Sequence, residues 1–208
     1  MSRNLSAVII FCMTISLCTG CYRDTTEQNF QKPVFINDVD NPGLPISSEL
    51  GYNTFGAYYN SKIWVSSKNQ NNISSDAEFI VGTFNDSTVI HFKGNDYTNQ
   101  PLEIDFLITK NVIVSDDDLV IFGKRSFNLK GDSVKIRIGS TVINAQSGSI
   151  NFSSVRSLIL DKKKMGTIIS GTFEMTGILN GNKVELENGR FDLLVPSMPH
   201  FYNYIGQW

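Results

Sequence analysis

The chain has 208 residues, of which 41% are hydrophobic, and this is enough for one domain with a sizeable core. Its 18 basic and 20 acidic residues give a net charge of −2, so no basic surface marks a nucleic-acid-binding protein. The three cysteines, Cys12, Cys18 and Cys21, all lie near the amino end, so the rest of the chain has no thiol for a disulfide or a thiolate metal site.

The first 20 residues have the pattern of a secretory signal peptide. Arg3 supplies a positive charge, residues 5–17 are mostly apolar, and small residues follow. The apolar run is shorter than the roughly 20 residues that a membrane-spanning helix needs. We therefore expect residues 1–20 to be removed.

The end of this segment, Thr19-Gly20-Cys21, resembles the cleavage site of a bacterial lipoprotein signal. The resemblance implies that Cys21 is the lipid attachment site and the first residue of the mature protein, with palmitate among its acyl chains. Several chains anchor a protein firmly, because each buried methylene contributes about 0.8 kcal/mol. Tyr22 stands where lipoproteins of the inner membrane carry Asp, which implies the outer membrane of a Gram-negative bacterium. The sequence does not decide between the cell-surface face and the periplasmic face of that membrane. The alternative to a lipoprotein signal is an ordinary cleaved signal peptide without lipid on Cys21.

Residues 21–50 are interpreted as the lipidated anchor and a tether. The segment is polar, contains Pro33, Pro42 and Pro45, and has little periodic apolar pattern. The alternative, for Val34-Phe35-Ile36, is an ordered edge segment that lies across a sheet.

Residues 51–195 predict an all-β domain. Leu102, Ile104, Phe106 and Ile108 recur at every second position, which is typical of a strand with one buried face. Similar alternation occurs at 88–92, 134–138 and 183–187. Turn-forming residues separate the runs, at Asn85-Asp86, Gly94-Asn95-Asp96, Lys130-Gly131-Asp132 and Asn180-Gly181-Asn182. We expect a single antiparallel sandwich or barrel of about ten strands.

The last segment, residues 196–208, is dense in aromatic side chains. Pro196 and Pro199 precede His200-Phe201-Tyr202-Asn203-Tyr204-Ile205-Gly206-Gln207-Trp208. We expect this tail to fold back over a sheet edge or the mouth of the core, because exposed aromatic area promotes aggregation. The alternative is a sticky surface that binds a partner.

Three segments resemble a known family. They are Thr54-Phe55-Gly56-Ala57-Tyr58-Tyr59-Asn60-Ser61-Lys62-Ile63-Trp64, Ile169-Ser170-Gly171-Thr172-Phe173-Glu174-Met175 and Val184-Glu185-Leu186-Glu187-Asn188-Gly189-Arg190-Phe191-Asp192. Together they are similar to small Bacteroidetes-type lipoproteins that carry a domain of unknown function, over about residues 52–195. Ser61 departs from the Gly usual in that family. Gly171 is expected at a bulge or a close packing site, so these residues favour a fold and supply no reaction.

The sequence gives little sign of a metal or cofactor. Neither of the two histidines, His91 and His200, has a metal-ligand neighbour at a suitable spacing. Asp116-Asp117-Asp118 lacks the alternating oxygens and the glycine of a calcium loop, so we interpret it as an acidic turn. We predict no metal and no cofactor.

Catalysis is also not indicated. No Gly-x-Ser-x-Gly motif occurs. Glu103 and Asp105 share one strand face, as do Glu185 and Glu187, and both pairs are interpreted as solvated because apolar residues occupy the opposite face. We therefore predict no catalytic residues and a protein that is not an enzyme, with a glycoside-cleaving enzyme as a minor alternative.

The function expected from these patterns is that of a lipid-anchored binding or assembly module, whose partner is a glycan or another envelope protein. Tyr58, Tyr59 and Trp64 are the candidate ligand contacts, because sugars stack on aromatic rings, although Trp64 is better explained as a core or rim residue. The alternative is a structural lipoprotein with no small ligand.

Overall fold

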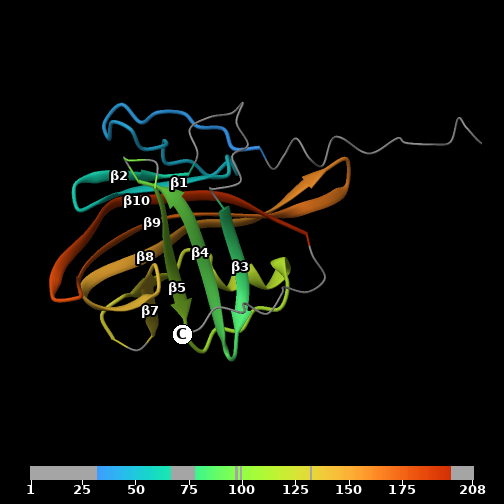
Figure 1. The fold of residues 1–208 in the computed structure, drawn as a ribbon. Helices are drawn as coiled ribbons and strands as arrows, with labels where there is room; N and C mark the ends of the chain where they lie inside the picture. The colour runs from blue at the N-terminus through green and yellow to red at the C-terminus, as the bar shows by residue number, and fades with distance from the viewer. Residues whose placement is uncertain (1–31, 67–77, 97, 99, 132, 198–208) are drawn as a thin grey trace, which may run out of the picture. The chain divides into compact units, whose positions relative to one another are not determined.

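The structure is a computed structural model, and it describes residues 32–66, 78–96, 98, 100–131 and 133–197. These residues form one antiparallel sheet of ten strands and a short 3-10 helix, so the prediction of an all-β fold is confirmed (Figure 1). The elements are β1 (Thr54–Tyr59), β2 (Lys62–Val65), β3 (Glu78–Phe84), β4 (Ser87–Asn95), β5 (Pro101–Ile108), the 3-10 helix η1 (Asp116–Phe122), β6 (Ser126–Asn128), β7 (Val134–Ile138), β8 (Thr141–Leu160), β9 (Lys163–Leu179) and β10 (Asn182–Pro196).

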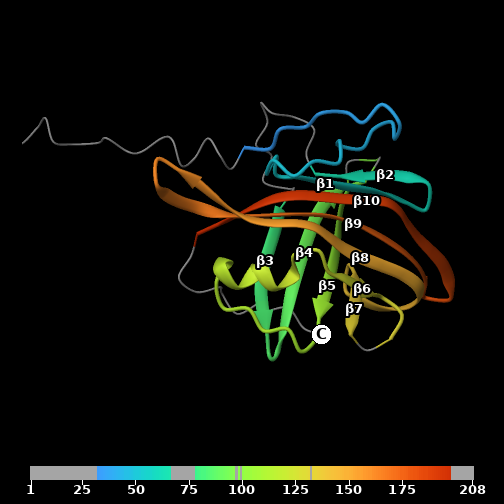
Figure 2. The same ribbon diagram turned by 180° about the vertical axis from the view of Figure 1, so that it is seen from behind.

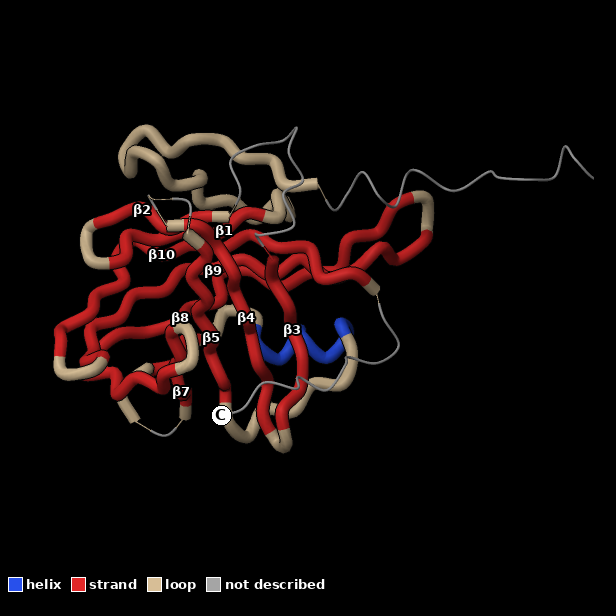
Figure 3. The backbone as a smooth tube through the Cα atoms, viewed as in Figure 1, coloured by secondary structure: helices blue, strands red, loops and turns tan. Residues whose placement is uncertain are grey.

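The sheet closes on itself. Its strands follow the order β2-β1-β10-β9-β8-β7-β5-β4-β3, and β6 pairs with β8 outside this path. Val65 of β2, the first strand of the path, also pairs with Asn95 of β4, the strand next to its last, β3. Figures 1 and 2, seen from opposite sides, show the long strands β8, β9 and β10 on one side of the domain and β3, β4 and β5 on the other, and the tube in Figure 3 shows how little helix the domain contains. The result is a barrel-like sheet with one interior.

Aromatic rings fill that interior. Phe92 lies at the centre, and the centroid of its ring is 5.1 Å from that of Phe55, 6.0 Å from that of Phe106 and 5.9 Å from that of Phe191. Such offset and edge-to-face pairs stabilise a core by more than their buried area alone. The helix η1 closes one end, where the ring of Phe122 stacks on Phe152 at 5.1 Å.

A segment before the first strand, residues 32–53, folds onto the domain, and we call it the arm. Its backbone pairs with itself, since the amide of Val34 donates to the carbonyl of Tyr52 at 2.8 Å and Ile46 donates to Ile36 at 2.8 Å. Residues 32–50, predicted as part of a tether, are therefore an ordered segment, and this segment includes Val34-Phe35-Ile36, for which an ordered edge segment was the alternative. The compact unit begins at Lys32 instead of residue 51.

One buried carboxylate holds the arm to the sheet. Asp192 of β10 accepts hydrogen bonds from the backbone amides of Leu50 (3.2 Å), Gly51 (2.8 Å) and Tyr52 (3.1 Å). It also accepts one from the hydroxyl of Ser48 and one from that of Ser170, at 2.8 Å. A polar segment without apolar periodicity thus becomes ordered because its backbone donors find an acceptor.

Gly171 on β9 is the close packing site that the sequence predicted. A Cβ at this position would lie 2.0 Å from the carbonyl oxygen of Asn151 and 2.6 Å from the ring of Phe191. We expect Gly171→Ala to lower the free energy of unfolding by about 1–3 kcal/mol, because the added methyl overpacks the core against backbone. Urea unfolding measures this change in the free energy of unfolding. Gly181→Ala is not a suitable control, because Gly181 has a φ of +80°, at which an alanine would be strained. Thr172→Ala, at an exposed position beside it, is a matched control.

Several sequence predictions meet a different outcome. Gly94 and Asn95, predicted as part of a turn, belong to β4. The helix η1 was not expected at all, although Ser115 and Asp118 form a capping box at its start. The predictions for the signal peptide (1–20), for Cys21, for Asp132 and for the tail from residue 198 onward, including His200, concern residues outside the described ranges. In the described part of the chain, no helix is long and apolar enough to cross a membrane.

Candidate functional site

The three aromatic residues predicted as ligand contacts do not share a surface. Trp64 is 0% exposed, its indole Nε1 donates to the carbonyl of Leu102 at 3.0 Å, and its ring packs on Phe55. Because neighbouring residues of a strand point to opposite faces, Tyr59 packs on the core while Tyr58 lies on the outer side and donates its hydroxyl to the carbonyl of Pro42 at 3.1 Å. Burial raises the pKa of Tyr59. The ligand-contact prediction for Trp64 is wrong, and its interpretation as a core residue is right.

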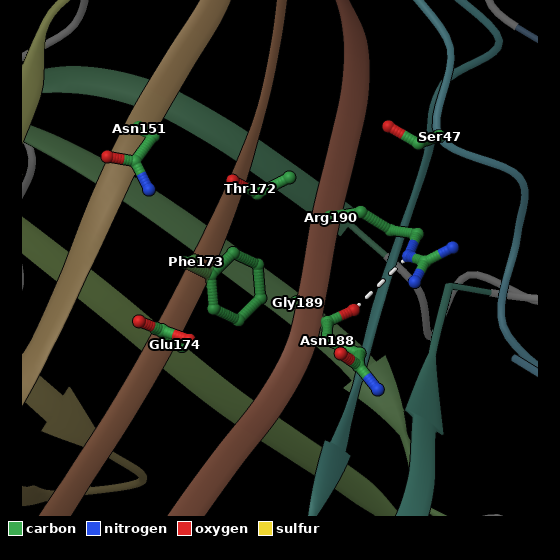
Figure 4. A pocket seen from close by; sticks show the side chains of 8 residues that line it. All are labelled: Ser47, Asn151, Thr172, Phe173, Glu174, Asn188, Gly189 and Arg190. Atoms are coloured by element: carbon green, nitrogen blue, oxygen red, sulfur yellow. Dashed lines mark hydrogen bonds between the residues drawn. The ribbon is translucent and has the colours of Figure 1, made fainter.

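A polar pocket instead lies on the outer face of β8, β9 and β10, beside the arm (Figure 4). It has a volume of about 270 Å³. The register places Asn151, Thr172 and Arg190 in one row across the three strands. The lining residues are Ser47, Asn151, Thr172, Phe173, Glu174, Asn188, Gly189 and Arg190.

The hollow forms where β10 departs from regular pairing. The register between β9 and β10 shifts between Leu186 and Gly189, and Asn188 has a positive φ of 52°. A bulge of this kind bends a strand and redirects its side chains. At Gly189, a Cβ would lie 2.4 Å from the ring of Phe173, so the glycine lets that ring sit beneath the pocket. Phe173 itself belongs to the buried core.

The pocket wall beside the arm is fixed by Arg190. Its Nε donates to the carbonyl of Asn188 at 3.1 Å, and its Nη1 donates to the carbonyl of Pro45 at 3.2 Å and pairs with the carboxylate of Asp38. The arm residues Asp38 and Pro45 therefore hold the guanidinium in place. The remaining polar lining consists of two amides, two hydroxyls and one carboxylate, Glu174, and these groups can donate and accept hydrogen bonds to a hydroxyl-rich ligand.

Asp38 gives this wall a dependence on pH. The side-chain amide of Asn41 and the guanidinium of Arg190 lower the pKa of Asp38 to about 2 from 3.8. A carboxyl whose pKa falls on folding contributes stability that is complete above the unfolded pKa and is lost as the pH falls through the folded pKa. The contribution of Asp38 is therefore present above about pH 4 and disappears toward about pH 2.

We therefore expect Asp38→Asn to lower the melting temperature at neutral pH, and the difference from the unchanged protein to shrink between pH 4 and pH 2. Melting temperatures measured from pH 7 to pH 2 check this. Asp40→Asn, at an exposed position two residues away, serves as the control. A difference that stays constant down to pH 2 would show that the Asp38 carboxylate does not stabilise the fold.

A second polar cluster lies on the outer face of β4, β5 and β7. It shows that the prediction of a solvated Asp105 is wrong. Asp105 was interpreted as solvated, but it is 0% exposed. The Nδ1 atom of His91 lies 2.5 Å from Oδ1 of Asp105, and Nε of Arg137 donates to Oδ2 at 2.6 Å. Cross-strand pairing places these three side chains in one row. The cluster ties three strands together, and His91 is a satisfied histidine as expected.

The three aspartates at the start of η1 all bind other groups of the protein. Asp116 is buried, accepts from the hydroxyl of Thr167 at 3.0 Å and pairs with Lys164 at 2.6 Å. Asp118 accepts from the amide of Val114 at 3.0 Å, and this bond lowers the pKa of the Asp118 carboxyl. Burial opposes the charge of Lys164, but its bonds to Asp116 and Asp117 outweigh burial and raise its pKa. Within the described ranges, no group of three or more His, Cys, Asp or Glu could hold a metal ion.

The fold and the pocket define an all-β domain built on one antiparallel sheet, with a polar pocket outside the core. Comparisons with protein families, with curated proteins and with solved structures gave no match.

Proposed function

We propose that this protein is a lipid-anchored, non-catalytic binding module of the outer membrane, and that its ligand site is the polar pocket on β8, β9 and β10. The observation that carries the proposal is the pocket lining. Asn151, Thr172 and Asn188 come from three adjacent strands, and Ser47 comes from the arm, so hydrogen-bonding groups surround one hollow of about 270 Å³.

The lining favours a glycan as the ligand. Amides, hydroxyls and a carboxylate pair well with the hydroxyls of a sugar, and Glu174 is the only carboxylate among the lining residues. Phe173 offers no stacking face, because it is only 2% exposed. We therefore expect binding through hydrogen bonds, with modest affinity for a single sugar unit.

The same lining supports binding over cleavage. Glycoside cleavage uses a pair of carboxyl groups about 5–10 Å apart, and the pocket lining has one. The two hydroxyls of the pocket, on Ser47 and Thr172, have no histidine among the lining residues to act as their base. A ligand would leave such a site unchanged.

Lipidation of Cys21 would keep this site close to the bilayer. The compact unit begins at Lys32, and the segment from Cys21 to Lys32 reaches about 35 Å when fully extended. We expect Cys21→Ser to move the protein from the membrane fraction to the soluble fraction of cells, which immunoblotting of the fractions measures. Replacing Cys18 with Ser is the matched control and should leave the protein in the membrane. Unchanged fractionation of Cys21→Ser would refute lipidation at that residue.

Glycan-array binding by the chain from Tyr22 onward tests the ligand. We expect binding to one class of bacterial, plant or host polysaccharide, and loss of that binding in Asn151→Ala/Thr172→Ala. Thr176→Ala, on the same face of β9 outside the pocket, should bind like the unchanged protein. If no polysaccharide on the array binds, a structural lipoprotein without a small ligand explains the protein better. A bound glycan that is recovered in shortened form would contradict the non-catalytic role.

A further inference from the structure

The hairpin that joins β8 to β9 projects beyond the sheet (Figures 1 and 2). The pairing of β9 with β10 ends where Gly166 meets Pro196, and the pairing of β8 with β6 ends at Asn151. Beyond these points, β8 and β9 continue to pair with each other up to the turn. Residues 159–164, which we call the tip, therefore form the end of a two-stranded ribbon.

The tip exposes apolar side chains beside η1. Ile159 is 64% exposed, and Lys164, its partner across the ribbon, pairs with Asp117 of η1. A 3-10 helix has three residues per turn, so Val120 lies on the same side of η1 as Asp117. Val120 is 66% exposed. Two large apolar side chains are therefore open to water near the ion pair that joins the tip to η1.

The tip is also basic. It reads Ile-Leu-Asp-Lys-Lys-Lys, with three lysines against the single acidic residue Asp161. Lys164 pairs with two aspartates of η1, whereas Lys162 and Lys163 are exposed. Exposed apolar side chains next to exposed lysines bind a surface that is both apolar and anionic. The headgroup region of a bilayer that contains anionic phospholipids has this chemistry.

The turn of the ribbon holds a lysine where glycine is favoured. Asp161 and Lys162 have φ values of 49° and 67°, in the left-handed region. The turn between β9 and β10 has the same form with Asn180 and Gly181, at 50° and 80°. Glycine adopts such a φ without steric cost, and a lysine does not. The backbone of the turn therefore does not explain Lys162, whereas a role for its charge at the end of the ribbon does.

The chain enters the domain beside the base of this ribbon. The amide of Val34 donates to the carbonyl of Tyr52 at 2.8 Å. Arg156 of β8 donates to the carbonyl of Glu49 at 2.7 Å. Because Glu49 and Tyr52 are three residues apart, the start of the arm and Arg156 lie close together. Arg156 comes three residues before the tip, which is about 10 Å along a strand.

The lipid anchor proposed for Cys21 brings a bilayer within reach of the tip. The compact unit begins at Lys32, and the segment from Cys21 to Lys32 spans at most about 35 Å. We propose, as a contact that rests on this anchor, that the tip and Val120 dock on the headgroup region of anionic phospholipids. The apolar side chains enter that region, and the exposed lysines of the tip bind its phosphates. The domain is then held at two points, which fixes its orientation on the membrane.

A fluorophore on the tip tests this docking. The chain from Tyr22 onward contains no cysteine, so Ile159→Cys gives one site for an environment-sensitive label. Vesicles of phosphatidylethanolamine and phosphatidylglycerol, with a nickel-chelating lipid, hold this chain by an amino-terminal hexahistidine tag. We expect the emission to shift to shorter wavelength and iodide quenching to slow when the chain binds these vesicles. Ile178→Cys, exposed near the other end of β9, is the matched control and should show neither change.

Two results with the labelled tip would overturn the proposal. The first is a tip that stays as accessible to iodide on these vesicles as in solution. The second is a spectral shift that appears without vesicles and grows with protein concentration, because a second copy of the chain would then cover the tip. The tag replaces the lipid on Cys21, so neither result depends on lipidation in the cell. Unchanged fractionation of Cys21→Ser refutes the anchor, whereas an undocked tip refutes this contact alone.

Lys162→Gly separates the charge of the tip from its fold. In the labelled and tethered chain, this variant should lower the ratio of docked to undocked tip about fivefold, the effect of one lysine near an anionic surface. The melting temperature should stay equal or rise, because glycine suits a φ of 67°. Lys130→Ala, at an exposed position before β7, should leave docking unchanged. Docking that Lys162→Gly does not weaken would overturn the proposal.

Discussion

Asp105→Ala is expected to lower the free energy of unfolding by about 3–5 kcal/mol, because it removes the buried carboxylate to which the guanidinium of Arg137 donates at 2.6 Å. His91 loses the same partner. Removing one member of a buried ion pair is costly mainly because the other charge stays away from water. Urea unfolding of the variant measures the loss directly.

Two further variants separate charge from packing at this row. Asp161→Asn, at an exposed hairpin turn, changes the same kind of group without burial and should alter stability by less than about 0.5 kcal/mol. Asp105→Leu/Arg137→Leu removes both charges, so it should be more stable than Asp105→Ala. If Asp105→Ala unfolds within about 1 kcal/mol of the unchanged protein, the row does not hold the three strands together.

Asp192→Ala is expected to release the arm and to lower the free energy of unfolding by about 3 kcal/mol or more. The variant leaves three backbone amides and two hydroxyls without their shared acceptor, and hydrogen bonds to a charged group contribute about 1.5–3 kcal/mol each, although not additively. Limited proteolysis should then cut within residues 32–53 before the sheet unfolds, because an undocked backbone is accessible.

Ser48→Ala is the matched control for the arm, because it removes one of the hydroxyls that Asp192 binds and leaves the three amides in place. It should cost about 1 kcal/mol and leave the arm resistant to protease. Asp192→Ala also removes an anchor of the arm that lines the pocket through Ser47, so glycan binding should fall with it. An arm that stays protected in Asp192→Ala would contradict the role of this carboxylate.

The alternation of apolar residues predicted much of the sheet. Ile104, Phe106 and Ile108 do face the core from β5, and the expected strands at 88–92 and 134–138 lie within β4 and β7. The same alternation misassigned Asp105, because it identifies two faces of a strand and says nothing of what covers the outer one. The partners of Asp105 are 14 and 32 residues away, and only the register of three strands brings them together.

The arm and the pocket could not be predicted from the sequence for a related reason. Asp192 orders the arm, residues 32–53, through backbone amides. Every residue type except proline has such an amide, so this contact leaves no apolar periodicity in the sequence of the arm. The pocket combines Ser47, Asn151, Thr172 and Asn188, and it depends on a bulge in β10 that a single sequence does not reveal. Among these features that were not predicted, the seven-residue helix η1 is the one with a sequence signal for its start, namely the capping residues Ser115 and Asp118.

We propose that the β domain is tied to a membrane through the sulfur of Cys21. The most direct test is the mass of the amino-terminal peptide of protein extracted from cell membranes with detergent. We predict a peptide that begins at Cys21 and carries a diacylglyceryl group on the sulfur and a further acyl chain on the amine. A mature chain that begins elsewhere, or a Cys21 without lipid, would contradict it.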